Sequence, residues 1–393
     1  MEKIFNNTAA AFSLKSDREL DRAYFLFRMI QNPVLVKIGT SLTTVALKFH
    51  LPVESLIRTT VFDHFCGGTN EVDCLPVVDK MFSAGVSAVL DYSVEGKEDE
   101  AHFDDAMQMT LKIIDFAKTR NAIPFAVFKP TGFGRFELYE KIGAGNSLSD
   151  DEKSEWNRVV ARFDNVCRKA HENDIAVLID GEESWMQDAA DDLVTEMMKK
   201  YNTNKAIVFN TLQLYRNDRL AFLKRLHAQA KNDGFFIGMK LVRGAYMEKE
   251  AKRADEKGYA TPICASKEAT DLNYDDGVKY MMDHIDTMAI FAGTHNEESS
   301  YKLMDLMAAK GIANDDKRIW FGQLYGMSDN ISYNLALNGY NVAKYLPFGP
   351  VREVMPYLIR RAQENTSVEG QTSRELGLIA AERSRRKLSK STS

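Results

Sequence analysis

The segment Val342–Asn365 reads VAKYLPFGPVREVMPYLIRRAQEN and contains a strand pattern followed by a helix pattern. The apolar run Val342–Leu346 predicts a buried strand, which Pro347, Gly349 and Pro350 should end. Pro350 suits the first turn of the following helix, because a helix offers no hydrogen-bond partner to an N–H at that position. A buried strand followed directly by a helix is the building unit of a parallel α/β fold.

The predicted helix has two faces when its side chains are placed at about 100° per residue. Its core face would consist of the apolar residues Val351, Val354, Met355, Leu358, Ile359 and Ala362. A second arc carries Tyr357, Arg360, Arg361 and Glu364. Two arginines beside a tyrosine can bind a small carboxylate, because a guanidinium group can donate two parallel hydrogen bonds to it. A solvated face with Arg–Glu ion pairs has the same spacing, so the helix alone leaves both interpretations open.

The strand–helix pattern repeats along the chain. Eight apolar runs of strand type occur at Ser87–Tyr92, Pro124–Lys129, Ile175–Asp180, Ala206–Asn210, Phe235–Val242, Met288–Thr294, Ile319–Gly322 and Val342–Leu346. Stretches of helical periodicity lie between them, such as Ala101–Thr119 and Ser184–Tyr201. Eight such units in roughly 250–280 residues favour a distorted (β/α)8 TIM-like barrel over an open doubly wound sheet.

The chain divides into three predicted parts. Residues 1–86 would form an N-terminal helical arm with one extra strand at Thr59–Gly68, residues 87–366 the barrel, and residues 367–393 a C-terminal helix and basic tail. The arm should contain a helix opened by the capping box Ser16–Glu19 and a second helix at Val34–His50. We expect the tail segment Arg383–Lys390 to be disordered rather than a binding arm. A further capping box, Ser149–Glu152, should open a helix of the barrel.

The composition is that of an ordinary globular protein, with 45% hydrophobic and 27% charged residues. The net charge of −5 gives no general attraction to nucleic acid or to an anionic membrane. The four cysteines, Cys66, Cys74, Cys167 and Cys264, have no metal-ligand spacing and suggest free thiols in a reducing compartment. The N-terminus lacks a secretory pattern, and no run of 18 apolar residues exists. These features predict a cytoplasmic protein without a metal site.

Polar side chains stand at the end of nearly every predicted strand, where a barrel of this type carries its functional groups. They are Asp91, Tyr92, Lys129, Asp180, Glu182, Glu183, Asn210, Gln213, Lys240, Arg243, Thr294, His295, Asn296, Gln323 and Tyr345. A purely structural barrel needs no such ring, so the pattern predicts an enzyme. Gly244 and Ala245, directly after a strand, would let the backbone approach a ligand closely.

Several of these segments resemble the flavin-dependent proline dehydrogenase family, in its monofunctional branch. The matching segments follow one another along the chain: LIDGEES (Leu178–Ser184), NTLQLY (Asn210–Tyr215), KLVRGAYMEKE (Lys240–Glu250), THN (Thr294–Asn296), QLYGM (Gln323–Met327) and the segment Tyr345–Asn365. The resemblance implies oxidation of L-proline to Δ1-pyrroline-5-carboxylate by hydride transfer to FAD, the first step of proline catabolism to glutamate. It also implies a quinone as electron acceptor and peripheral contact with the inner face of a membrane.

The resemblance implies roles for individual residues. Arg360 and Arg361 would bind the proline carboxylate with Lys129 as a further cation, Tyr345, Tyr357 and Leu324 would pack on the ring, and Glu364 would pair with an arginine. Asp180 would lie near the substrate and order Lys129, so the catalytic set would be Lys129, Asp180, Tyr345, Arg360 and Arg361. FAD contacts would come from Asp91, Gln213, Lys240, Val242, Gly244, Ala245, His295 and Asn296. Met247 departs from the aromatic residue of bifunctional relatives, and Ala265–Lys267 match the adenosine-binding segment only loosely.

The residue chemistry suits this activity, because arginines that anchor the carboxylate would aim the ring at the flavin. A cation beside the flavin, either Lys240 or Arg243, would stabilise its reduced form. Three alternatives remain: a hydroxyproline dehydrogenase, a cofactor-free or metal-assisted barrel lyase, and an interaction protein that binds through the arm and tail. Tyr345 would crowd a ring hydroxyl, which favours proline.

Overall fold

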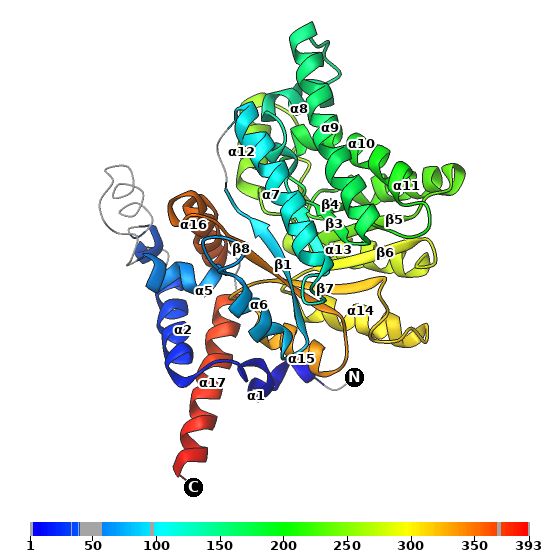
Figure 1. The fold of residues 1–393 in the computed structure, drawn as a ribbon. Coiled ribbons are helices and arrows are strands. Elements are labelled where there is room, and N and C mark those ends of the chain that lie inside the picture. The colour runs from blue at the N-terminus through cyan, green and yellow to red at the C-terminus, as the bar shows by residue number, and fades with distance from the viewer. Residues whose placement is uncertain are drawn as a thin grey trace. The chain divides into compact units, whose positions relative to one another are not determined.

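The computed structural model describes the chain except residues 1–2, 33, 38, 40–56, 95–97, 368–370 and 392–393, and it leaves out the side chains of residues 59–60, 361–367, 371 and 390–391. Eight parallel strands close into a barrel in chain order, β1 to β8, with helices between them, which confirms the predicted fold class (Figure 1). Contacts divide the chain into two compact units, Met1–Glu95 with Gln323–Ser393, and Gly96–Gly322. Each unit is described by itself.

The unit Gly96–Gly322 contains most of the strands. They are β2 (Phe125–Phe128), β3 (Ala176–Ile179), β4 (Val208–Gln213), β5 (Ile237–Val242), β6 (Met288–Gly293) and β7 (Ile319–Leu324), whose last two residues belong to the other unit. The helices between them are α7 (Glu100–Lys118), η3 (Pro130–Gly132), α8 (Phe136–Gly143), α9 (Asp150–Asn173), α10 (Ser184–Tyr201), α11 (Arg219–Asp233), α12 (Met247–Lys257), α13 (Lys267–Asp283) and α14 (Glu297–Ala309). Ser149 and Glu152 form the predicted capping box of α9.

Aromatic rings fill the interior of this unit where the strands begin. The Phe125 ring lies 6.0 Å from the Phe209 ring, 5.2 Å from the Phe291 ring and 5.1 Å from the Trp320 ring, each in an edge-to-face arrangement. Edge-to-face contacts suit the ring quadrupoles and add to the energy of apolar burial. The barrel is therefore a packed core at this end, and its polar groups lie where the strands end.

The unit formed by the chain ends contains β1 (Val86–Tyr92) paired in parallel with β8 (Val342–Phe348). Its helices are η1 (Ile4–Asn6), α1 (Thr8–Ala11), α2 (Asp17–Ile30), η2 (Arg58–Phe62), α5 (Asp63–Phe65), α6 (Leu75–Phe82), α15 (Asp329–Leu337), α16 (Val351–Ser367) and α17 (Gln371–Ser391). The capping box Ser16–Glu19 opens α2, as predicted. One apolar cluster joins α2 to α17 through Leu20, Phe27, Leu378 and Ile379, so the chain ends pack on each other.

Three sequence predictions differ from the structure in this unit: the strand at Thr59–Gly68, the disordered tail, and the end of strand β8 before Pro347. Thr59–Gly68 is not a strand, because residues 58–65 form η2 and α5, whose side chains Phe62 and Phe65 pack in a cluster with α16. Only Gly67 and Gly68 meet the sheet, through a hydrogen bond from Gly67 N–H to the Pro347 carbonyl (2.8 Å) and a bridge to Phe348. Of Val34–His50, only residues 34–37 and 39 are described, and they are helical.

The basic tail is helical rather than disordered. Arg386 bonds Asp17 (3.0 Å), Glu382 (2.7 Å) and the carbonyl oxygens of Lys15 and Phe12. Arg383 bonds Asp21 (2.7 Å) and lies over the Tyr24 ring. These contacts use the tail arginines to attach α17 to the N-terminal helices, which explains why a charged segment is ordered here.

Strand β8 also runs further than its sequence suggests. It continues through Pro347 to Phe348, and α16 begins at Val351, directly after Pro350. Pro347 lacks an N–H, but its carbonyl still accepts the hydrogen bond from Gly67. Proline at this position therefore permits the strand, and the break comes at Gly349 and Pro350.

Candidate functional site

Asp180, directly after β3, forms the centre of a buried charge cluster with two lysines. Its Oδ1 accepts a hydrogen bond from Lys240 Nζ on β5, and its Oδ2 lies 3.9 Å from Lys129 Nζ after β2. The side chains of Asp180 and Lys129 are 16% exposed and that of Lys240 is 8% exposed. Asp180 was expected to order Lys129; in the structure its closer partner is Lys240.

Glu182, two residues further on, is a buried carboxyl group with an altered proton affinity. It accepts hydrogen bonds from the backbone N–H (2.9 Å) and the hydroxyl (2.7 Å) of Thr131. Burial nevertheless raises the pKa of the Glu182 carboxyl to about 7. The group sits beside the Lys129–Asp180 pair in sequence and titrates near neutrality, a property common at functional sites.

Gln213, the last residue of β4, has an amide nitrogen that is hydrogen-bonded and an amide oxygen that has no partner among the described residues. Its Nε2 donates to the backbone carbonyl of Glu182 (2.9 Å). Its Oε1 is buried and has no hydrogen-bond partner in the part of the chain that the structure describes. An unmade hydrogen bond of this kind costs about 1–3 kcal/mol, so this oxygen is suited to accept a donor from a bound molecule.

The segment after β5 brings backbone, rather than side chains, to the strand end. Gly244 has a φ of +139°, and a Cβ added there would lie 2.4 Å from the Tyr215 ring. Only glycine fits both conditions. The neighbouring Val242 and Arg243 carbonyls accept hydrogen bonds from the N–H groups of Leu214 (2.8 Å) and Tyr215 (2.7 Å), which fix the segment against β4.

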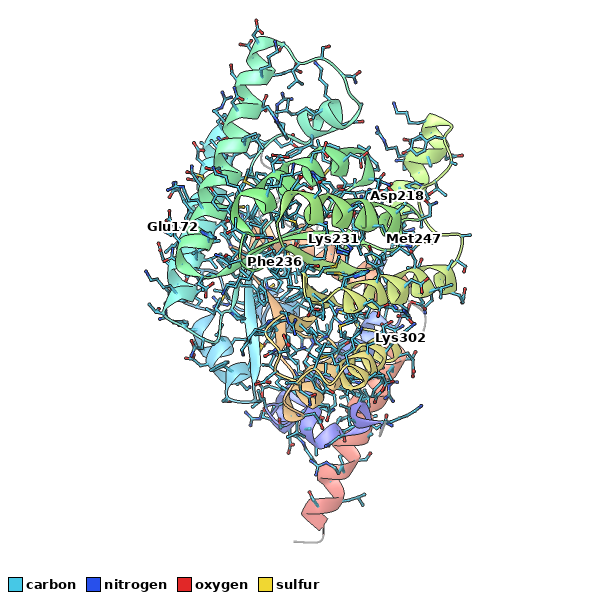
Figure 2. All side chains as sticks on the ribbon, turned by 90° about the vertical axis from the view of Figure 1, so that its right-hand side faces the viewer. Glu172, Asp218, Lys231, Phe236, Met247 and Lys302 are labelled. Carbon is cyan, nitrogen blue, oxygen red and sulfur yellow. The ribbon has the colours of Figure 1, made fainter. Side chains whose placement is uncertain are left out.

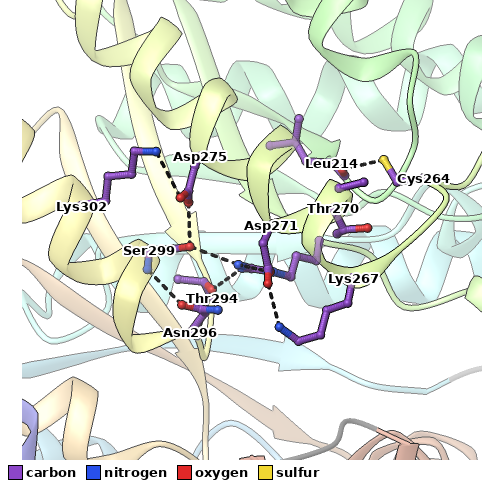
Figure 3. A network of polar contacts seen from close by, with 12 residues as sticks. Leu214, Cys264, Lys267, Thr270, Asp271, Asp275, Thr294, Asn296, Ser299 and Lys302 are labelled. Carbon is purple, nitrogen blue, oxygen red and sulfur yellow. Dashed lines mark hydrogen bonds and ion pairs between the residues drawn. The ribbon is translucent and has the colours of Figure 1, made fainter.

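Arg243 is held by protein contacts around the end of β6. It donates to Asp271 (2.7 Å), to the Thr294 hydroxyl (2.8 Å) and to the Ser299 hydroxyl (3.1 Å), and it lies over the Tyr274 ring. Figure 3 shows the network continuing on both sides, from Lys267 to Asp271 and from Ser299 through Asp275 to Lys302. Arg243 thus positions the strand end rather than a ligand.

The Thr294–Asn296 segment is held in place by this network. The Thr294 hydroxyl accepts the N–H of Asn296 (3.1 Å), and Asn296 Oδ1 caps α14 by accepting the N–H of Ser299 (3.0 Å). Ser266 caps α13 in the same way, with the N–H of Ala269 at 3.2 Å. His295 and Asn296 lie at the strand end, as expected, whereas Met247 at the start of α12 is 53% exposed (Figure 2).

Sequence analysis missed a clamp between α12 and the loop after β3. The carboxylate of Glu250, which is fully buried, accepts hydrogen bonds from the N–H (2.7 Å) and the hydroxyl (2.6 Å) of Ser184. Lys249 pairs with Glu183 (2.5 Å). Glu250 lies within a charged stretch that looks solvent-exposed in sequence, and its only sequence signal is its place in the matching segment Lys240–Glu250.

The other unit contains the remaining expected site residues. Tyr357, Leu324 and the apolar face of α16 pack into one cluster, and Tyr345 on β8 is buried. Tyr357 is therefore not on a solvated face; Arg360 is half-buried. The side chains of Arg361, Ala362 and Glu364 lie outside the described residues, although the backbone of α16 continues through them and through Pro356. Asp91, at the end of β1, is buried and accepts a hydrogen bond from the Ser93 hydroxyl (2.9 Å).

A second buried charge cluster in this unit was also missed. Asp329, at the start of α15, pairs with Lys344 (2.8 Å) and Lys15 (3.1 Å). Burial alone would raise the pKa of Asp329, but the two lysines hold it below its ordinary value. Glu375 accepts the N–H of Ser328 (3.0 Å), and burial raises its pKa to about 7. The cluster fixes the turn after Leu324.

Comparisons with known proteins show which family the chain resembles. The profile of the family described as proline dehydrogenase matches residues 74–374. The chain is 38% identical over 332 residues to the carbapenem antibiotics biosynthesis protein CarD of Pectobacterium carotovorum subsp. carotovorum, covering 84% of this chain and 85% of that protein. It is 31% identical over 412 residues to hydroxyproline dehydrogenase of Xenopus laevis, covering 95% and 88%.

The chain is similar to one part of a larger solved structure. Proline utilization A from Bdellovibrio bacteriovorus, inactivated by N-propargylglycine, matches with a TM-score of 0.71 and 21% identity. The match covers 93% of this chain and 37% of that one. At this identity the likeness bears on the fold, and it agrees with the closed barrel.

Proposed function

The chain belongs to the proline dehydrogenase family and is an oxidoreductase, and on this premise we propose that it oxidises L-proline to Δ1-pyrroline-5-carboxylate with FAD as hydride acceptor. The observation that carries the proposal is the family match, which extends over residues 74–374 and hence over every strand of the barrel. The half-buried Lys129 after β2 and the buried Lys240 on β5 support it, because they supply the cations that an anionic substrate and a reduced flavin require.

FAD would supply the hydride acceptor, and the residues at the strand ends fit such a cofactor. The buried Gln213 Oε1 needs a donor, and the backbone at Gly244 offers a close approach that a side chain would block. We assign cofactor binding to Asp91, Gln213, Lys240, Val242, Gly244, Ala245, His295 and Asn296. Of the two cations considered for the flavin, Lys240 is favoured, since Arg243 is committed to Asp271, Thr294 and Ser299.

The substrate would be held by its carboxylate. We assign that contact to Arg360, Arg361 and Lys129, with Asp180 maintaining the position of the buried lysines. Tyr345, Tyr357 and Leu324 would pack on the ring, and Glu364 would orient an arginine. Proline must lose a proton from nitrogen before hydride transfer, and the protein's task is to bind the neutral amine and aim the adjacent ring carbon.

The electrons would pass from the flavin to a quinone, and the product would be processed further to glutamate. A quinone acceptor calls for peripheral contact with a membrane, and we place the enzyme in the cytoplasm at the inner face of that membrane. Among the described helices, none has the length and apolar character needed to cross a bilayer. The quinone and the membrane contact rest on the family alone.

The flavin spectrum tests the proposal directly. Purified protein should show a flavin absorption band that bleaches when L-proline is added under anaerobic conditions, and a colourless protein that FAD cannot reconstitute would contradict it. Arg361→Met should raise the KM for proline at least tenfold while FAD stays bound. Arg352→Met, an exposed arginine on the same helix, serves as the matched control. Equal kinetics of the two variants would show that Arg361 is part of a surface ion-pair patch.

A second candidate substrate is hydroxyproline, because the relative from Xenopus laevis carries that name and matches 95% of this chain. Tyr345 is buried on β8, where its ring would crowd a hydroxylated substrate. We therefore expect kcat/KM to favour L-proline over trans-4-hydroxy-L-proline, and Tyr345→Ala to narrow the ratio. A wild-type preference for hydroxyproline would replace proline by hydroxyproline as the substrate.

A further inference from the structure

A chain of buried hydrogen bonds leads from an ion pair between α10 and α11 to the amide of Gln213. It begins at Arg219 and Asp191, whose side chains are 1% and 2% exposed and lie 2.6 Å apart. It continues through Gln187 on α10 and the peptide groups of Glu182, and it ends at Gln213 on β4. From Gln213 onward each group donates to the next, and the series ends at the Asp191 carboxylate, to which Arg219 donates from the other side.

The orientation of the Gln213 amide follows from its partner. The Glu182 carbonyl can only accept a hydrogen bond, so the atom 2.9 Å from it must be the amide nitrogen of Gln213. Oxygen and nitrogen of an amide are often hard to distinguish, but here the partner decides between them. The buried Oε1 consequently presents an acceptor, never a donor, to whatever lies next to it.

Gln187 holds Glu182 by its backbone N–H, and the two partners of the Gln187 amide fix its orientation. The Glu182 N–H can only donate, so Gln187 Oε1 faces it at 2.8 Å. Gln187 Nε2 then faces Asp191 Oδ1 at 2.9 Å, and an ionised carboxylate can only accept. A flipped Gln187 amide would set donor against donor at one end and acceptor against acceptor at the other.

The Asp191 carboxylate anchors this relay. Arg219 Nη2 donates to its Oδ2 (2.6 Å), while Gln187 and Asn210 Nδ2 (2.9 Å) both donate to its Oδ1. Asn210 Oδ1 accepts the N–H of Thr211, so its amide is oriented too. All three partners donate to Asp191, which agrees with the orientation of the Gln187 amide and holds that side chain in place.

We propose that this relay is a positioning device that locks Gln213 with its oxygen toward the cofactor, so that the site selects a flavin bearing a ring N–H. The oxidised isoalloxazine ring carries a single N–H, at N3, and a methyl group there removes the donor. Gln187, Asp191 and Arg219 touch no cofactor and act through Gln213. The inference rests on the proposed use of FAD and deepens it by naming what distinguishes one flavin from another.

The test compares the affinity of the apoprotein for FAD and for N3-methyl-FAD, measured by the change in flavin fluorescence on binding. Wild-type protein should bind FAD about tenfold to a hundredfold more tightly, the cost of leaving one buried acceptor unpaired. Gln187→Met keeps the side-chain volume and removes the relay. The ratio of the affinity for FAD to that for N3-methyl-FAD should therefore fall at least about threefold, chiefly through weaker FAD binding. Gln213→Met, which removes the acceptor itself, should reduce the ratio further.

Asn202→Leu is the matched control, because the Asn202 amide makes three buried hydrogen bonds and one part-buried one at the other end of β4, to residues 207, 208 and 236. It should lower the melting temperature and leave the ratio at the wild-type value. A wild-type ratio near one overturns the proposal, as does a Gln187→Met ratio equal to that of wild type. A protein that binds neither flavin contradicts the proposed function instead, so the two failures are distinguishable. If Gln187→Met does not fold, Asp191→Asn, which keeps the size of the side chain and removes the charge that binds Gln187 and Arg219, takes its place, and a ratio equal to that of wild type again overturns the proposal.

Discussion

Replacing Asp180 with Asn should remove the charge at the centre of the lysine cluster while keeping the size of the side chain. Asparagine can still accept one hydrogen bond, but it leaves the ammonium groups of Lys240 and Lys129 without the carboxylate that pairs with both. The three side chains are at most 16% exposed, so water replaces the lost charge only in part. We expect lower stability, weaker catalysis and a displaced Lys240.

The magnitude follows from the burial and the distances. Removing one partner of a buried ion pair costs about 3–5 kcal/mol, and the residual exposure of Asp180 places the expected loss of unfolding free energy near the lower figure, about 3 kcal/mol. The Lys129 contact, at 3.9 Å, contributes less than the hydrogen-bonded Lys240 contact. If Lys240 moves by about 1 Å, kcat/KM should fall roughly 100-fold.

A double-mutant cycle measures whether Asp180 acts through Lys240. Urea unfolding and steady-state kinetics on Asp180→Asn, Lys240→Met and the double variant should give a coupling energy of about 2 kcal/mol or more, because the second substitution removes a charge that the first leaves unpaired. The same cycle with Lys129→Met should give a smaller coupling. Additive effects of Asp180→Asn and Lys240→Met would refute the reasoning.

Two further predictions concern a buried acid and a strained glycine. Burial raises the pKa of Glu375 to about 7, above its unfolded value of 4.5, so the free energy of unfolding should fall by roughly 3 kcal/mol in total as the pH rises between these values. Urea unfolding at pH 5 and pH 8 should give a smaller change in unfolding free energy for Glu375→Gln than for wild type, and equal changes would exclude this carboxyl as the cause. Gly244→Ala should destabilise the fold by about 2 kcal/mol or more and lower flavin content, because of its positive φ and the Tyr215 ring; unchanged melting temperature and flavin content would show that the ring moves away.

The barrel was predictable because its strands are buried on both sides. A buried parallel strand must be apolar along its whole length, so each of the eight runs stands out against amphipathic helices. The ends of the strands were less accurate, as β4 continues from Asn210 to Gln213 and β8 continues through Pro347. Polar or proline residues at a strand end look like a turn in sequence, although the backbone still pairs.

The Thr59–Gly68 segment shows where local pattern fails. Threonine, valine and phenylalanine in succession favour a strand by propensity. Their aromatic side chains Phe62 and Phe65 instead pack with Val354 and Leu358 of α16, almost 300 residues away in sequence. Tertiary burial of this kind overrides propensity, and only the assembled fold reveals it. The ordered tail has the same origin, since Arg386 finds its partners on the N-terminal helices.

The choice between Lys240 and Arg243 as the cation of the site required the structure for a related reason. Lys240 lies within β5, whereas Arg243 follows its last residue, Val242. The alternation of side chains along a strand therefore does not tell from sequence which of the two cations faces the site. Lys240 meets Asp180 from β3, whereas Arg243 meets Asp271 from α13 and Thr294 after β6. The same charge, three residues apart, thus serves the candidate site in one case and holds its wall in the other.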